Sequence, residues 1–203
     1  MLHNVCQKHP TSRDLLRERT WELHDSLERI PVMSRVFDDA LSLDDYRRHL
    51  AVLYGVVRPL EVRLGEVQAE HGADTLLWRY EPRAAALQAD LLQLGVPSNA
   101  LAQVPVTALP AIRDEAEALG VAYVLEGSRL GGKVIHKRLC DYFGDAVPTR
   151  YYTATQEPQR WPRFVEVLNS VEDTLWQTRI CDAAVATFQC LCDWAASPEG
   201  CHE

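Results

Sequence analysis

The chain lacks several features that would place it in common classes of protein. None of its apolar runs approaches the roughly 18 residues that mark a membrane-spanning helix, and no charged and then apolar leader opens the sequence. We therefore expect a cytoplasmic protein without a membrane partner. The net charge of −8 at pH 7 argues against binding that neutralises phosphates, so we also expect no nucleic-acid partner.

Paired cysteine motifs and nucleotide-binding motifs are missing as well. The six cysteines have no CxxC spacing, so we expect free thiols in a reducing compartment. Neither a dinucleotide-binding glycine motif nor a P-loop occurs. No segment shows the alternation of apolar and polar residues that is typical of a β-strand. What remains is a series of helical patterns.

Helical periodicity covers most of the chain. Thr11-Ser12 with Asp14 predicts the start of a helix that continues to about Arg29, and Ser42 with Asp45 predicts the start of a second one. That second pattern covers residues 43–71, and further helical patterns cover residues 82–94, 110–139, 161–168 and 171–194. We therefore predict an all-α protein with one domain at residues 11–195, a mobile arm at 1–10 and a frayed tail at 196–203.

Two residue types inside the second helical pattern carry separate predictions. Pro59 removes a backbone donor, so it predicts a kink in this helix. His49 and His71 have no partners at the spacing of metal ligands, and we predict that both lie on the surface.

The stretch Tyr123–Ile135 is unusual for a helix because it contains three glycines. Gly127 and Gly131 are four residues apart and share one face, with Gly132 beside them. Each interior glycine costs a helix about 1 kcal/mol relative to alanine. Such a helix either bends there or keeps its backbone bare so that something flat can approach closely. Close packing of small residues against another helix is the alternative explanation of this spacing.

The amino-acid sequence of this stretch resembles that of the distal helix of bacterial haem oxygenases. It reads Tyr-Val-Leu-Glu-Gly-Ser-x-Leu-Gly-Gly-x-Val-Ile, and it is the specific part of the resemblance. Supporting features follow in the family's order: an early His24 within Leu-His-Asp-Ser-Leu-Glu, the aromatic pair Tyr151-Tyr152, and Trp161-x-x-Phe164. Together they span roughly residues 11–195. The resemblance implies a multi-helix bundle that holds haem between a proximal helix and a kinked distal helix.

The resemblance also implies roles for individual residues. His24 would be the axial ligand of the iron, and Glu28, one turn later, would accept the N–H of the other ring nitrogen. Gly127 and Gly131 would let the macrocycle approach the distal backbone, with Gly132 beside them. Ser128 would support the distal water network, at a position where the mammalian branch carries an aspartate.

Further residues would contact the periphery of the haem. Arg17 lies two turns before His24, and it and Arg163 are the candidate partners of the haem propionates. Tyr123 and Tyr152 would either border the haem or pack in the core. The implied reaction is oxidation of haem at a meso carbon to biliverdin, with release of CO and iron, so haem is both substrate and cofactor.

The electrons would come from an external donor, because the sequence has no nucleotide-binding motif. A ferredoxin or an NADPH-linked reductase fits that role, and a bacterial phytochrome is a candidate recipient of biliverdin. The alternative is a non-catalytic haem-binding or haem-delivery protein on the same fold. A thiaminase-like hydrolase or a carboxylate-bridged di-iron oxidase is disfavoured, because Cys140 has no evident base and the chain lacks the pair of Glu-x-x-His motifs that a di-iron bundle uses.

Overall fold

The computed structural model describes residues 10–71, 76–104, 107–154 and 157–197. The predicted N-terminal arm and C-terminal tail therefore lie almost wholly outside the described residues. Every regular element in the described part is helical, which confirms the all-α prediction. These elements are α1 (Ser12–Arg29), α2 (Pro31–Ser34), the 3-10 turn η1 (Arg35–Phe37), α3 (Leu43–His71), α4 (Ala84–Gln93), α5 (Ser98–Ala102), α6 (Glu115–Phe143), α7 (Arg150–Thr153), α8 (Arg160–Ser170) and α9 (Thr174–Ala196).

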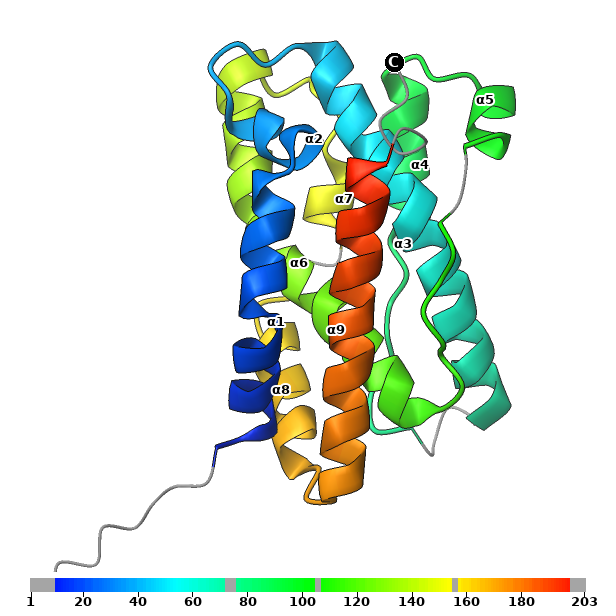
Figure 1. Ribbon diagram of the computed structural model, residues 1–203. Helices are drawn as coiled ribbons and strands as arrows, with labels where there is room; N and C mark the ends of the chain where they lie inside the picture. Colours follow the sequence, from blue (N-terminus) through cyan, green and yellow to red (C-terminus); the bar gives the residue numbers. More distant parts are fainter. Residues whose placement is uncertain (1–9, 72–75, 105–106, 155–156, 198–203) are drawn as a thin grey trace, which may run out of the picture.

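The long helices pack side by side in one bundle (Figure 1). Helix α9 packs against both α1 and α6 along much of its length, and α6 passes behind α9 in this view. Helices α3 and α4 lie on the far side of α9 from α1. None of the helices among the described residues combines the length and apolarity that crossing a bilayer requires.

Helix α1 begins where its capping residues predict. The Thr11 hydroxyl accepts the Asp14 N–H at 3.2 Å, and the Asp14 carboxylate accepts the Thr11 N–H at 3.1 Å, which together form a capping box. Leu16 and Thr20 face the core and are buried. His24, one turn beyond Thr20 on the same face, is only half covered. The inner face of α1 therefore changes from core to cavity wall along its length.

Helix α3 remains helical through Pro59. Because Pro59 has no N–H, the carbonyl of Gly55, four residues earlier, has no helical donor. Instead it accepts a hydrogen bond from the N–H of Thr107 at 3.3 Å. The break in the helical ladder thereby anchors the connection between α5 and α6.

The prediction that His49 lies on the surface is wrong. Its side chain is 1% exposed. Its Nδ1 lies 3.0 Å from the carbonyl oxygen of Val32 in α2, so this nitrogen carries the proton and donates. Its Nε2 lies 2.7 Å from the Tyr152 hydroxyl of α7, which therefore donates to it. Helices α2 and α7 cover this side of α3, and apolar periodicity does not reveal a histidine buried by such polar contacts.

Helix α6 crosses α9 closely at Gly120. A Cβ at this position would lie 2.7 Å from the Ala183 Cβ and 2.9 Å from the Ala184 nitrogen, and would also overlap the Ile180 carbonyl. Contacts this short do not occur between real atoms, so only glycine allows the observed crossing. Gly120 thus sets how deeply α6 sits in the bundle.

A buried ion pair joins the middle of α6 to α8. Glu126 is 1% exposed, and its carboxylate accepts the Nε and Nη2 of Arg160 at 2.9 and 2.6 Å. Trp78 Nε1 donates to the same carboxylate at 3.1 Å, and Arg129 Nε lies 2.8 Å from it. A buried carboxylate with several donors is stable in place, whereas removing one partner leaves an uncompensated charge. This pair fixes α8 against the glycine-rich part of α6.

Candidate functional site

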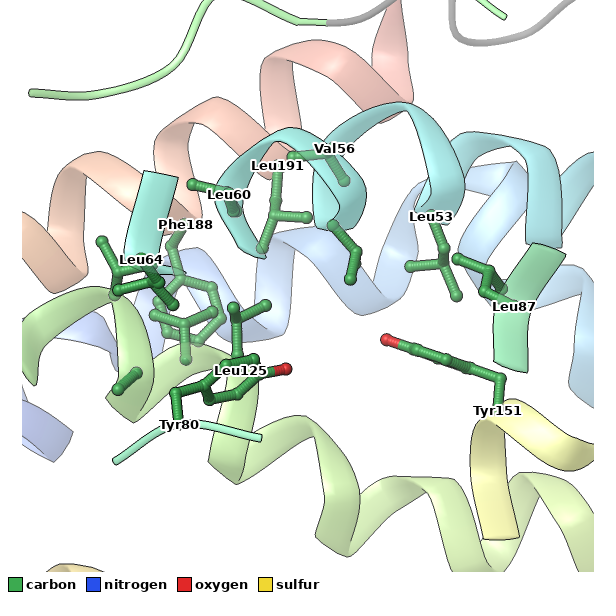
Figure 2. Packing of buried hydrophobic residues seen from close by; sticks show 14 of the residues in the cluster. Leu53, Val56, Leu60, Leu64, Tyr80, Leu87, Leu125, Tyr151, Phe188 and Leu191 are labelled. Carbon is green, nitrogen blue, oxygen red and sulfur yellow. The ribbon is translucent and has the colours of Figure 1, made fainter. Parts of the chain in front are cut away.

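A cavity of about 460 Å³ lies between α1 and α6. Its volume is within the range of roughly 300–1,000 Å³ that is usual for small-molecule sites. The wall from α1 includes Arg17, Thr20, Trp21, His24, Leu27 and Glu28, and the wall from α6 includes Tyr123, Leu125, Gly127, Ser128, Leu130 and Gly131. Leu53, Tyr151, Phe188 and Leu191, which other helices contribute, are seen around this space in Figure 2.

His24 is the only histidine among the described residues that lines the cavity. Its ring stacks parallel to Trp21 at 6.3 Å and meets the Phe188 ring edge-on at 5.8 Å, which holds it in place. Its Nδ1 lies 3.8 Å from Glu28 Oε1, which is longer than a hydrogen bond. Among the described residues Nε2 has no hydrogen-bond partner. An imidazole nitrogen with no protein partner is available to a ligand from the cavity.

Gly127 and Gly131 expose bare backbone across the cavity from His24. A Cβ on Gly131 would meet nothing within 4 Å, and a Cβ on Gly127 would meet only the Trp161 ring at an ordinary 3.8 Å. Protein packing therefore does not require glycine at either position, although glycine disfavours the helix. This geometry supports close approach of a ligand over close helix packing for these two residues.

Gly132 faces a different neighbour. A Cβ there would lie 3.2 Å from the Tyr152 ring, and Gly132 is buried against α7 rather than on the cavity wall. Tyr152 likewise stays outside the wall, with its hydroxyl bonded to His49. Packing against α7 therefore explains Gly132, and the structure does not bring it together with Gly127 and Gly131.

The Ser128 hydroxyl is held by a buried arginine that sequence reasoning missed. Ser128 Oγ donates to the Leu125 carbonyl at 2.7 Å and accepts Arg83 Nη2 at 2.8 Å. Arg83 is 2% exposed and also donates to the Leu125 carbonyl at 3.0 Å. Its position directly before an apolar helix is a weak hint of burial, but no spacing rule connects it with Ser128. The distal wall thus has a buried cation behind it.

The two predicted propionate partners differ in position. Arg17 lines the cavity, its guanidinium lies 5.8 Å from the Trp21 ring centroid, and it forms no ion pair with any described residue. Arg163 does not line the cavity, and its Nη1 lies 2.6 Å from Glu157 Oε1 on the exposed face of α8. Arg17 therefore lies at the α1 side of the cavity as a cation without an ion-pair partner among the described residues.

Tyr123 and Trp161 close the cavity beside the glycines. Their ring centroids are 5.8 Å apart, and both line the cavity. Burial raises the pKa of the Tyr123 hydroxyl above its usual value, so Tyr123 stays protonated and neutral near pH 7. The surroundings of the cavity are therefore largely aromatic and aliphatic, with few charged groups.

The fold and this cavity define an all-α protein in which an imidazole faces a bare stretch of helix across an apolar space. The sequence profile of the family described as Heme oxygenase matches residues 12–197. The chain therefore belongs to the haem oxygenase family.

Individual relatives and solved structures also resemble the chain. A curated relative from Xanthomonas campestris pathovar campestris, described as a heme oxygenase, is 37% identical over 93 residues. That match covers 45% of this chain and 53% of the relative, about half of its length. The structure of heme oxygenase from Leptospira interrogans superposes with a TM-score of 0.71 at 18% identity, covering 92% of this chain and 98% of that one. Heme oxygenase-1 from the cyanobacterium Synechocystis, solved in complex with heme, gives 0.68 at 17% identity and covers 94% and 93%.

Proposed function

We propose that this chain is a haem oxygenase, which cleaves haem at a meso carbon to biliverdin with release of CO and iron, using O₂ and external electrons. The single observation that carries the proposal is that His24, whose Nε2 has no hydrogen-bond partner among the described residues, lines the same apolar cavity as the bare backbone of Gly127 and Gly131. Membership of the haem oxygenase family supports the same conclusion.

His24 is the proposed iron ligand, through Nε2. Glu28 is the group that fixes the other ring nitrogen, because its carboxylate lies near Nδ1 on the next turn of α1. We expect a rotation of this exposed side chain to shorten the 3.8 Å separation to a hydrogen bond. That bond would hold the N–H on Nδ1 and leave Nε2 free for the iron.

The opposite face is proposed to be shaped by α6. Gly127 and Gly131 let a flat macrocycle lie directly against the helix backbone, and Trp161 covers the same edge of α6. Ser128 is held by Arg83 and accepts hydrogen bonds from water on this side. Haem supplies the O₂ chemistry when it is bound, and these residues orient it, limit the access of bulk water and leave one face open.

The periphery of the haem has one clear partner. Arg17 is the proposed partner of a propionate, because it lies at the cavity without a described carboxylate. Arg163 would have to leave its pair with Glu157 to reach the same ligand, so its contribution is secondary. Tyr123 borders the haem in this proposal, whereas Gly132 acts indirectly by packing on Tyr152.

The proposed reaction needs an external electron donor, because the sequence contains no nucleotide-binding motif. A ferredoxin or an NADPH-linked reductase is the proposed donor, and a bacterial phytochrome is a candidate recipient of biliverdin. The expected location is the cytoplasm. Among the residues that the structure describes, no three His, Cys, Asp or Glu side chains are grouped so that they could hold a metal ion.

A hemin titration followed by reduction tests the function. The protein should form a stoichiometric hemin complex with a Soret band. Adding ascorbate, or a ferredoxin with its reductase, in air should remove the Soret band while a biliverdin band grows and free CO appears. A complex whose Soret band persists under the same conditions would instead support the non-catalytic haem-binding alternative, and no observation on this chain favours it at present.

A further inference from the structure

Tyr151 is anchored to the cavity wall by a buried carboxylate. Asp90 of α4 is fully buried, and its two oxygens accept the N–H groups of Arg150 at 3.0 Å and Tyr151 at 2.8 Å. These are the first two N–H groups of α7, which otherwise have no helical partners. The backbone of Tyr151 is thereby fixed relative to α4.

The ring of Tyr151 is held as firmly as its backbone. The Arg83 guanidinium lies 4.6 Å from its centroid, and the Tyr152 ring meets it at 5.2 Å with an interplanar angle of 69°. Tyr151 is only 3% exposed, yet it lines the cavity. A phenol fixed on two sides in this way has a preorganised direction for its hydroxyl.

The hydroxyl of Tyr151 has no hydrogen-bond partner among the described residues. Three other buried tyrosines do: Tyr46 donates to the Pro148 carbonyl, Tyr80 to Glu61, and Tyr152 to His49, each at 2.7 Å. Buried tyrosine hydroxyls usually find such a partner. Among the buried tyrosines that the structure describes, Tyr54 and Tyr151 have none, and of these two only Tyr151 lines the cavity. Figure 2 shows the Tyr151 hydroxyl pointing away from α7 into the space between Leu53 and Leu125.

Ser128, the polar side chain expected on the distal side, cannot act as a donor there in this arrangement. A hydroxyl has one proton, and that of Ser128 is used in the 2.7 Å bond to the Leu125 carbonyl. One of its lone pairs accepts Arg83. Ser128 therefore offers only an acceptor to the cavity, and a donor must come from another residue.

We propose that Tyr151 is the distal hydrogen-bond donor of this site, directed at the small ligand that binds haem on the face opposite His24. This inference rests on the proposed function, because it needs haem in the cavity. Arg83 then has a positioning role: it holds the Tyr151 ring with its charge and holds the Ser128 hydroxyl as an acceptor. The distal wall consequently presents one donor and one acceptor at fixed places.

Fluoride binding to the ferric hemin complex tests this donor without turnover, because iron-bound fluoride accepts hydrogen bonds. Tyr151→Phe keeps the ring and its contact with Arg83 and removes only the hydroxyl. The variant should bind fluoride roughly three- to tenfold more weakly than the parent, the factor that corresponds to one hydrogen bond. Its hemin stoichiometry and Soret position before fluoride is added should match the parent and show that the site is intact.

Tyr152→Phe is the matched control, because it removes the neighbouring hydroxyl, which is bonded to His49 outside the cavity. Its fluoride affinity should equal that of the parent. If Tyr151→Phe binds hemin and binds fluoride as tightly as the parent, the inference is wrong while the proposed function stands. If Ser128→Ala weakens fluoride binding and Tyr151→Phe does not, the inference is wrong as well. If the parent itself forms no hemin complex, the proposed function fails and the inference fails with it.

Discussion

Two regions of this molecule each contain a glycine and a histidine, but the surroundings of these residues differ. In one region they are packed against other residues, and in the other they border open space. Gly120 and Gly131 lie on the same helix, about three turns apart. At Gly120 the neighbouring helix occupies the place of a side chain, whereas beside Gly131 there is open space. His49 is buried with both ring nitrogens bonded to protein, whereas His24 is half exposed with one nitrogen unpartnered among the described residues.

The difference shows which feature marks a site. Residue type does not, because each pair consists of identical residues. Burial alone does not either, since His49 is the more buried histidine and has no role at the cavity. What distinguishes them is the open space beside Gly131 and the ring nitrogen of His24 that has no partner among the described residues. The closed region needs its glycine and histidine for folding, whereas the glycine and histidine of the open region are the ones that we propose for binding a ligand.

Replacing His24 should have the largest effect, on both haem binding and turnover. His24→Ala should lose the spectrum of a histidine-ligated hemin complex and all turnover, because no other described histidine lines the cavity. Absorption spectra of the hemin complex measure this directly. His71→Ala, at the exposed end of α3, is the control and should behave as the parent. A Soret band in His24→Ala identical to that of the parent would remove the ligand assignment and the comparison with it.

The second prediction concerns His49 and pH. Burial lowers the pKa of His49 from its usual 6.5 to about 4. Between these values the unfolded chain binds a proton that the folded protein does not, so stability should rise as the pH rises from about 4 to about 6.5 and then level off. The shift corresponds to about 3 kcal/mol.

Urea unfolding at a series of pH values measures this dependence. His49→Gln replaces the imidazole with an amide that does not titrate and that has both a donor and an acceptor for Val32 and Tyr152. The parent should lose stability on acidification through this window more steeply than the variant. Parallel pH profiles for the two proteins would show that His49 is not the buried neutral group described above.

The third prediction concerns Gly120. Gly120→Ala should lower the free energy of unfolding by about 1–3 kcal/mol, because the added methyl overlaps the backbone of α9 and the helices must separate. Gly65→Ala is the matched control: Gly65 is also helical, and a Cβ there meets nothing within 4 Å. Chemical denaturation of both variants measures the difference. Equal stability changes would mean that the α6–α9 crossing is looser than described.

The sequence predicts those parts of the fold that depend on neighbouring residues. The starts of α1 and α3 follow from Thr11 and Ser42, whose capping partners lie three residues later. Gly120 was not predicted, because its contact with Ala183 joins distant parts of the chain. His49 was mispredicted for the same reason, since the groups that bury it come from α2 and α7.

The site divides in a similar way. The local residue pattern and the family resemblance led to His24 and to Gly127 and Gly131, all of which line one cavity in the structure. Arg83 and its link to Ser128 could not be predicted, because α4 and α6 are brought together only by folding. The tyrosine pair was noted in the sequence, but only the structure separates Tyr151 on the wall from Tyr152 in the core.

The smallest expected effect on stability is at Gly131, and it has the opposite sign to that at Gly120. Gly131→Ala should raise the free energy of unfolding by about 0.5–1 kcal/mol, because alanine favours the helix and its methyl meets no described atom. Chemical denaturation without hemin measures this change.

Gly131→Leu then separates folding from ligand binding at the same position. A Cβ at this position meets nothing within 4 Å, so we expect the variant to fold as stably as the parent. With hemin, the same side chain occupies the place where a flat macrocycle would lie against α6, so affinity and turnover should both fall. A Gly131→Leu protein that is destabilised like Gly120→Ala, or that binds and degrades haem normally, would show that the bare face of α6 is not kept for a ligand.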